Sequence, residues 1–549
     1  MKKKMTAKII SILTAAVLGA TAVIGVPGLS LKTEAAAART VAITSCTIQG
    51  ANVVAQVHAD QVPAGDDGLY YLFANEVYQD GAAGKAVATA QIAADAQLVA
   101  PLGFGTPDNN LMRKFMIMVK RGNSMVQVSN ERYITNPEAV ATQTTPRNDH
   151  GIKGLLPNSA DAATFKDLGV AQLIYNFYLG DIVGPSSDPA LPTIEFPYCG
   201  HVYQFNTKAL QNYDGYASFC QSNGFQLTVT LLNNKTAAGA DLIHPGARDG
   251  HACPGYAMNT KEPGGTEHLK AIATFLAARY SGTDGHGKID NWIIGNEVNA
   301  RTEWYHLNST NLEYNVSEYV KAFRIFYNGI KSVNANARVY NSIDQEWGRK
   351  SNPGCFLSRQ YLDRFTDIIN REGNIDWGLS FHPYNSPLYD PYAWKQQACW
   401  VRADYSTPYI TMENIDLLTN YMTQPGYLAP NGQVRSISIS EIGFTSSYGE
   451  DAQLASIVYG YLMAASNPHI DAFMLFREVD DAHEMQSNIA QGLKRPDGSQ
   501  KPAYQIYKAM GTGGQAAAAA QASQIIGQDV NALVANRTML LRGGWDLNS

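Results

Sequence analysis

Residues 147–512 alternate between strand-like and helix-like segments, and this alternation limits the possible folds more than any other feature. The strand candidates are short apolar runs bounded by turn residues. They span residues 151–156, 170–177, 225–232, 289–299, 337–343, 376–382, 434–443 and 471–476. The helix candidates span residues 159–168, 208–222, 266–280, 316–332, 359–371, 451–465 and 503–511, and the stretch after the sixth strand has no clear structure. Eight such units predict an α/β fold, the (β/α)8 (TIM) barrel.

A different pattern precedes the barrel. Residues 39–138 contain six short strand-like runs, at 41–48, 52–57, 69–75, 86–92, 115–120 and 125–128, separated by turn residues. Even spacing of short strands predicts a small all-β, sandwich-like domain. Such a domain either binds glycan or braces its neighbour. The Ala/Gln-rich tail, residues 513–549, has no functional interpretation.

The first 38 residues have the pattern of a secretory signal peptide. Lys2, Lys3 and Lys4 precede an apolar stretch from residue 9 to about 26, and small residues at 35–38 offer cleavage sites. We therefore expect a secreted protein. The alternative is a retained membrane anchor, so contact with a membrane is expected only if this segment stays. The net charge of −6 provides no basic surface for nucleic acid.

Two predicted strands each end in a glutamate. In IDNWIIGNEVN an apolar run leads to Glu297, and in VRSISISEIG serines and isoleucines alternate before Glu441. The carboxyl ends of all strands meet at one mouth of a (β/α)8 barrel, where its sites lie. Paired carboxylates are the groups that cleave glycosidic bonds. The strand order therefore predicts a glycosidase site at this mouth.

The motifs resemble those of the clan A glycoside hydrolases, the 4/7 barrel superfamily. That clan places an acid/base glutamate after an asparagine on strand four and a nucleophilic glutamate on strand seven. Asn296-Glu297 and Glu441 stand at these positions here. His382 and Tyr384, after the sixth strand, resemble positions that contact the nucleophile or the sugar. The sequence departs from the clan at Val298, where proline is common, and at Phe476-Arg477, where tryptophan is common.

The resemblance implies a retaining glycoside hydrolase acting on a poly- or oligosaccharide. Glu297 would be acid and then base, and Glu441 would attack the anomeric carbon, with the carboxyls about 5–5.5 Å apart. Asn296 would bind the sugar 2-hydroxyl. An inverting hydrolase or a transglycosylase fits the same residues. A non-catalytic carbohydrate-binding or scaffold protein on a degenerate barrel is the alternative from another class.

Further residues have open interpretations. Arg477 is predicted to meet either Glu441 or a substrate carboxylate, or else to point into solvent. Asn176 and Asn233 end the second and third strands and are candidates to line the pocket. Glu413, in YITMENID, competes with Glu441 as nucleophile, but it would give the barrel one strand too many. Loop tryptophans, Trp304 among them, can stack on sugar faces.

Neither a cofactor nor a metal is expected. The sequence has no HExxH motif and no CxxC spacing of the kind that binds zinc. Its six cysteines can form disulfides in an exported protein, but the sequence assigns no pairing. The expected partner is a carbohydrate substrate.

Overall fold

The computed structural model describes residues 40–147 and 151–542, with side chains described as far as residue 536. The predicted signal peptide, residues 1–38, lies outside the described residues.

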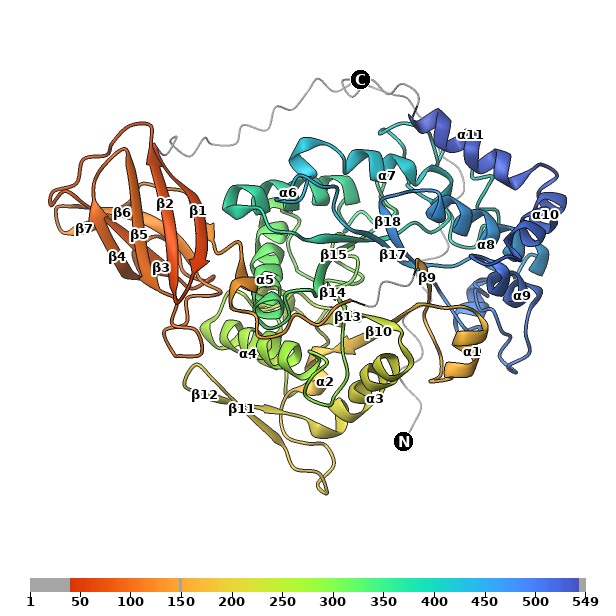
Figure 1. Cartoon of the computed structure of the whole chain (residues 1–549), viewed down its shortest axis with the longest axis horizontal. Helices are drawn as coiled ribbons and strands as arrows, with labels where there is room; N and C mark the ends of the chain where they lie inside the picture. The colour runs from red at the N-terminus through yellow and green to blue at the C-terminus, as the bar shows by residue number, and fades with distance from the viewer. Residues whose placement is uncertain (1–39, 148–150, 543–549) are drawn as a thin grey trace. The chain divides into compact units, whose positions relative to one another are not determined.

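The centre of the chain is a closed barrel of eight parallel strands (Figure 1). Each strand pairs with the next one along the barrel, and the last pairs with the first. The strands are β9 (Lys153–Leu155), β10 (Gln172–Tyr178), β13 (Gln226–Leu232), β14 (Asn291–Ile294), β15 (Arg338–Asp344), β16 (Gly378–His382), β17 (Ile437–Ile442) and β18 (Ile470–Leu475). The predicted (β/α)8 fold is confirmed, and each predicted strand overlaps an observed one.

The alternation in the seventh strand explains how it fits between barrel interior and helices. Ile437 and Ile439 belong to the large apolar core. Ser440 bonds Ser380 of the neighbouring strand β16, and Ser436, just before β17, has its Oγ 2.7 Å from the hydroxyl of Tyr340 on β15, the strand beyond β16. Successive side chains of a strand face opposite ways, so small serines fill the narrow interior while isoleucines meet the helices.

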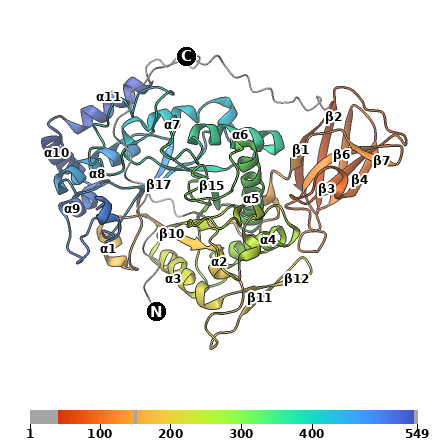
Figure 2. The ribbon, with the colours of Figure 1, turned by 180° about the vertical axis from the view of Figure 1, so that it is seen from behind.

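Helices cover the outside of the barrel, and neighbours such as α4, α5 and α6 pack against one another (Figure 1 and Figure 2). The main helices are α1 (Ala162–Asp167), α3 (Thr207–Asn223), α4 (Pro263–Arg279), α5 (Leu312–Val333), α6 (Ser358–Gly373), α8 (Glu450–Ala465) and α9 (Pro502–Ala509). Local sequence sets their ends. Asn206 and Asn311 cap α3 and α5 through their side-chain oxygens, and Gly224 ends α3 at φ +78°.

Three regions that the sequence left without structure are ordered. The insertion after β10 contains α2 (Leu179–Ile182) and the hairpin β11 (Ile194–Tyr198)–β12 (His201–Phe205). The stretch after β16 contains α7 (Asp416–Tyr421). The tail contains α10 (Gln515–Ile526), which packs against α8, and α11 (Val530–Arg542).

The N-terminal part consists of two antiparallel sheets whose apolar side chains share one core. One sheet joins β1 (Val41–Gln49), β2 (Asn52–Ala59) and β5 (Asp95–Pro101). The other joins β3 (Leu69–Asn75), β4 (Lys85–Gln91), β6 (Lys114–Arg121), β7 (Ser124–Gln127) and β8 (Arg132–Tyr133). The sandwich-like architecture is confirmed, although β5 and β8 were not predicted.

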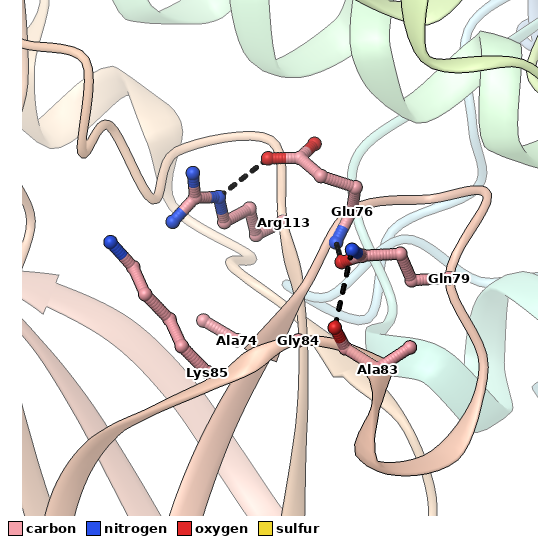
Figure 3. A pocket seen from close by; sticks show the side chains of 7 residues that line it. All are labelled: Ala74, Glu76, Gln79, Ala83, Gly84, Lys85 and Arg113. Atoms are coloured by element: carbon pink, nitrogen blue, oxygen red, sulfur yellow. Dashed lines mark hydrogen bonds and ion pairs between the residues drawn. The ribbon is translucent and has the colours of Figure 1, made fainter.

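Buried polar contacts fasten this part to the barrel helices. Figure 3 shows Arg113 directed at Glu76, with its Nε 2.7 Å from Glu76 Oε1. The other oxygen of Glu76 pairs with Lys270 of α4. On α5, buried Asn328 donates to the carbonyl of Leu111, and the Arg324 guanidinium lies 4.6 Å from the ring centre of Tyr133. The contacts support bracing for this domain.

Among the described residues, no helix has both the length and the apolar character needed to span a bilayer. All six cysteines have free thiols.

Candidate active site

Glu297 lies in a tight turn immediately after β14. Gly295 at φ +76° and Glu297 itself at φ +38° both adopt left-handed backbone conformations. The turn is held by β15, because Glu297 N–H donates to Ser342 Oγ at 3.1 Å and Val298 N–H donates to the Ser342 carbonyl. A non-glycine residue held at positive φ costs free energy and is concentrated at functional sites.

Glu441 lies within β17, where the pairing with β18 is irregular. Ile439 pairs with Phe473 and Ile442 with Leu475, so β17 has one extra residue between these points. Such a bulge changes the direction of the side chains beside it. Within a strand that is otherwise buried from Ile437 to Ile442, Glu441 alone is partly exposed.

His382 connects the two glutamates. Its Nδ1 lies 2.7 Å from Glu297 Oε1 and 4.0 Å from Glu441 Oε2. Because both carboxylate oxygens lie near the same nitrogen, the distance between them cannot exceed the sum of these two distances. The Tyr384 hydroxyl donates to Glu441 Oε1 at 2.7 Å. Four side chains from the ends of three strands thus form one cluster.

The environments of the two glutamates differ. The Glu297 side chain is 13% exposed and that of Glu441 30%. Burial raises the pKa of Glu297 from 4.5 to about 7, with His382 opposing the rise and the charges of Asp344 and Glu441 adding to it. A carboxyl with such a pKa can exchange a proton near neutral pH.

The partners of the two glutamates are also shifted. Burial disfavours the cationic form of His382, but the charges of Glu441 and Glu297 outweigh it and raise the pKa above 6.5. Burial and the charge of Glu441 raise the pKa of Tyr384 well above 10, so Tyr384 stays a hydrogen-bond donor at neutral pH.

A cavity of about 310 Å³ opens beside this cluster. Glu297, Tyr384 and Glu441 line it, together with apolar and aromatic side chains that include Trp304 and Phe476. The other lining residues are Glu303, Asp344, Gln345, Glu346, Ser351, Leu388, Glu484, Ile489 and Gln491. Asp344 was not predicted as a site residue, although it ends the fifth strand as Glu297 follows the fourth. Nothing local marks Glu484 or Gln491, which reach the cavity from the loop after β18.

Other predicted residues lie near the mouth or away from it. Asn296, next to Glu297, is half-buried, and Asn176 on β10 is exposed, but neither lines the cavity. Asn233 is 2% exposed and donates to the carbonyls of Leu242 and Ala257, so its amide secures a loop. Asn233 was predicted to line the pocket, but it does not line the cavity, because these hydrogen bonds to backbone carbonyls hold it in the interior.

Arg477 and Glu413 also lie outside the cavity. Arg477 Nη1 lies 3.3 Å from Glu484 and 3.5 Å from Asp481, with a side chain only 15% exposed. It therefore meets neither Glu441 nor solvent in the way the sequence suggested. Glu413 lies in a 3-10 turn, Met412–Asn414, and accepts a hydrogen bond from the backbone of Gln396.

Within the described parts of the chain, no group of three or more His, Cys, Asp or Glu side chains is arranged to hold a metal ion. The chemistry visible at the cavity is that of a buried carboxyl beside a more exposed carboxylate. One group can supply a proton while the other faces the same bound molecule.

Solved structures similar to the chain include three carbohydrate-active enzymes. A family 39 glycoside hydrolase from Bacteroides cellulosilyticus WH2 has 15% identity and a TM-score of 0.44, covering 83% of this chain and 78% of that one. A glucosidase from Croceicoccus marinus has 14% identity and a TM-score of 0.41, covering 67% and 69%. A β-glucuronidase from Ruminococcus gnavus has 10% identity and a TM-score of 0.35, covering 85% and 68%.

No curated protein matches the chain in sequence. A protein-family model does match, over residues 145–533, which include the whole barrel and α10. Its description is "Family of unknown function (DUF5722)". The match covers more than half of the chain, and the protein therefore belongs to the DUF5722 family.

Proposed function

We propose that this protein is a retaining glycoside hydrolase that cleaves a poly- or oligosaccharide. The observation that carries the proposal is the pair Glu297 and Glu441, joined through His382 at one cavity. Retaining enzymes hold their two carboxyl groups about 5–5.5 Å apart, whereas inverting enzymes leave about 6.5–9.5 Å for a water. The contacts to His382 favour the shorter separation. The glutamates also follow the strand order of the clan A enzymes.

In the first step, Glu297 acts as general acid. Its carboxyl gives a proton to the glycosidic oxygen as the bond to the anomeric carbon breaks, and a Glu441 oxygen bonds to that carbon. The raised pKa keeps Glu297 mainly protonated at the start below about pH 7. The Tyr384 hydroxyl, which donates to Glu441 Oε1, leaves Oε2 of that carboxylate to attack.

In the second step, Glu297 acts as general base. Having lost its proton, it takes one from a water that attacks the anomeric carbon, and the bond to Glu441 breaks. The sugar leaves with its original configuration, and both carboxyls regain their starting states. His382 holds Glu297 in place through both steps by its hydrogen bond to Oε1.

The predicted signal segment supports a site of action outside the cytoplasm. N-terminal sequencing of exported protein should then find a start near residues 36–40. An intact Met1 on membrane-bound protein would favour the anchor instead.

The roles of the two glutamates are tested by removing each one. Glu441→Ala should abolish nearly all turnover of aryl glycosides, and added azide should yield a glycosyl azide of inverted configuration. Glu297→Ala should spare substrates with good leaving groups, which need little protonation, and azide should yield a retained adduct. NMR of the products distinguishes the two configurations.

Glu195→Ala, an exposed position on β11, serves as the control and should keep parental rates. Wild-type rates in both glutamate variants would contradict the assignment. Binding of glycans without cleavage across a broad panel would instead support the degenerate-barrel alternative.

A further inference from the structure

The cavity beside the proposed catalytic pair is lined by an unusual excess of acidic groups. Six of its lining side chains are carboxylates, and none of the described residues that line it is lysine or arginine. The carboxylates are Glu297, Glu303, Asp344, Glu346, Glu441 and Glu484. Two carboxylates suffice for glycoside hydrolysis, so the remaining four need another explanation.

Asp344 and Glu346 are nearly buried and are held by neutral donors. Asp344 is 5% exposed and accepts from Ser358 Oγ and from the backbone of Glu346, while Glu346 is 8% exposed and accepts from the backbone of Ser351. Burial raises the pKa of Glu346 to about 7, and the charge of Asp344 adds to the rise. Neither carboxylate has an ion-pair partner in the described structure, so both add negative potential to the cavity once they are ionised, which for Glu346 is above about pH 7.

Two basic side chains close to the cavity-lining carboxylates, His382 and Arg477, are already paired with carboxylates. His382 faces both Glu297 and Glu441. Arg477 lies close to both Glu484 and Asp481. Proteins that recognise carboxylate or sulfate groups present an arginine fork or a lysine to them. An anionic sugar entering this cavity would meet acidic oxygens instead.

Gln491 provides an independent indication of what the cavity binds. Its side chain is 2% exposed and lines the cavity, and among the described residues nothing accepts a hydrogen bond from its Nε2. Buried donors of this kind are rarely left unpaired in native proteins. A neutral sugar hydroxyl accepts such a bond, and Trp304 and Phe476 offer apolar faces to the sugar ring.

We propose that the sugar bound beside Glu297 and Glu441 carries no negative charge, and that Asp344, Glu346 and Glu484 exclude uronic acids and sulfated sugars from this position. Gln491 donates to a hydroxyl of the accepted sugar. This inference rests on the proposed function, because it names the substrate class of the same site. It assigns specificity to acidic residues that serve neither as the acid nor as the nucleophile of the cleavage.

Pairs of aryl glycosides that differ only at C6, with a hydroxymethyl group or a carboxylate, test the inference. In the gluco or galacto series, above about pH 7 where Glu346 is ionised, wild-type kcat/KM for the neutral member should exceed that for the uronide at least ~100-fold, because like charges brought together cost several kcal/mol. Glu346→Gln and Glu484→Gln should each narrow this ratio about tenfold or more. Glu195→Gln, exposed on β11, should leave the ratio as it is.

A uronide cleaved as well as its neutral partner, or ratios unmoved in both variants, would overturn the inference. Turnover of any member supports the proposed function separately. If nothing is cleaved, calorimetry with cellobiose and its uronate counterpart needs no turnover. Tighter binding of the neutral sugar would then support the inference and contradict the proposed hydrolysis. Tighter binding of the uronate, or no binding of either sugar, would contradict the inference.

Discussion

At the scale of single residues, the site depends on one carboxyl that is buried and one that is not. Glu297 and Glu441 are the same residue type, and only their surroundings separate their roles. Burial raises the pKa of Glu297 to about 7, and the nearby charge of Asp344 contributes. A carboxyl whose pKa is raised by its environment is suited to be the acid, which assigns that role to Glu297.

This difference predicts a pH dependence. Glu297 must be protonated to act as acid, so kcat/KM should fall as pH rises through about 7. Asp344→Asn removes a negative charge that disfavours ionisation of Glu297, and should move this limb of the pH profile to lower pH, by up to about one unit. The measurement is the pH profile of kcat/KM for an aryl glycoside.

Asparagine can still accept the bonds from Ser358 and the Glu346 backbone, so the Asp344→Asn variant should fold. Glu195→Gln is the control and should leave this limb of the pH profile of kcat/KM at the parental pH. A limb that stays in place or moves upward in Asp344→Asn would show that the charge of Asp344 does not reach Glu297.

At the scale of elements, the turn after β14 positions the proposed acid. Gly295 at φ +76° has no room for a side chain, because an added Cβ would lie 2.9 Å from Val298 Cγ1 and 3.0 Å from the Tyr305 ring. This turn also places the backbone N–H of Glu297 within hydrogen-bond distance of Ser342 Oγ on β15. Strand, turn and neighbouring strand thus form one positioning unit.

Gly295→Ala should therefore lower both stability and turnover. Positive φ and the two close contacts should cost roughly 2–4 kcal/mol in free energy of unfolding. A displaced Glu297 should also lower kcat of the protein that remains folded. Urea denaturation and kinetics on the folded fraction measure the two effects.

Gly215→Ala is the matched control. Gly215 lies exposed within α3, and an added Cβ meets nothing within 4 Å. Alanine favours a helix interior over glycine by about 0.5–1 kcal/mol, so this variant should be slightly more stable with unchanged activity. Equal behaviour of the two variants would contradict the role of the turn.

At the scale of the whole molecule, the N-terminal sheets and the barrel share buried ionic contacts. Glu76, 11% exposed at its side chain, lies between Arg113 of its own domain and Lys270 of α4. Breaking such a pair leaves charge in the interior without its partner. The two parts should therefore unfold together.

Glu76→Ala should lower the free energy of unfolding by on the order of 3 kcal/mol, in a single transition. The control is Asp108→Ala, which removes an exposed ion pair with Lys85 and should leave the Tm nearly unchanged. Scanning calorimetry compares them. Two separate transitions in the parent, or an unchanged Glu76→Ala variant, would show that the domains are energetically independent.

Much of the fold and the central residues of the site can be predicted from the sequence. Eight apolar strand segments, each at its place in a repeating order, predict the barrel because hydrophobic periodicity is local information. Parallel strands direct their carboxyl ends to one mouth, so strand order alone brings Glu297, His382, Tyr384 and Glu441 to the same end. The strands β5 and β8 escaped prediction. So did the tail helix α10, although its Ala-rich sequence has a high helix propensity.

Which side chains reach the cavity depends on contacts between segments that are distant in the chain. The bulge in β17 and the left-handed turn at Glu297 arise from pairing with neighbouring strands, and no local pattern encodes them. Asn233 follows a strand as predicted, but its side chain is buried because it donates hydrogen bonds to backbone carbonyls of a nearby loop. Gln491 enters the cavity from a long loop. Local sequence fixes where a strand ends, whereas the direction of a side chain depends on packing between segments distant in the chain.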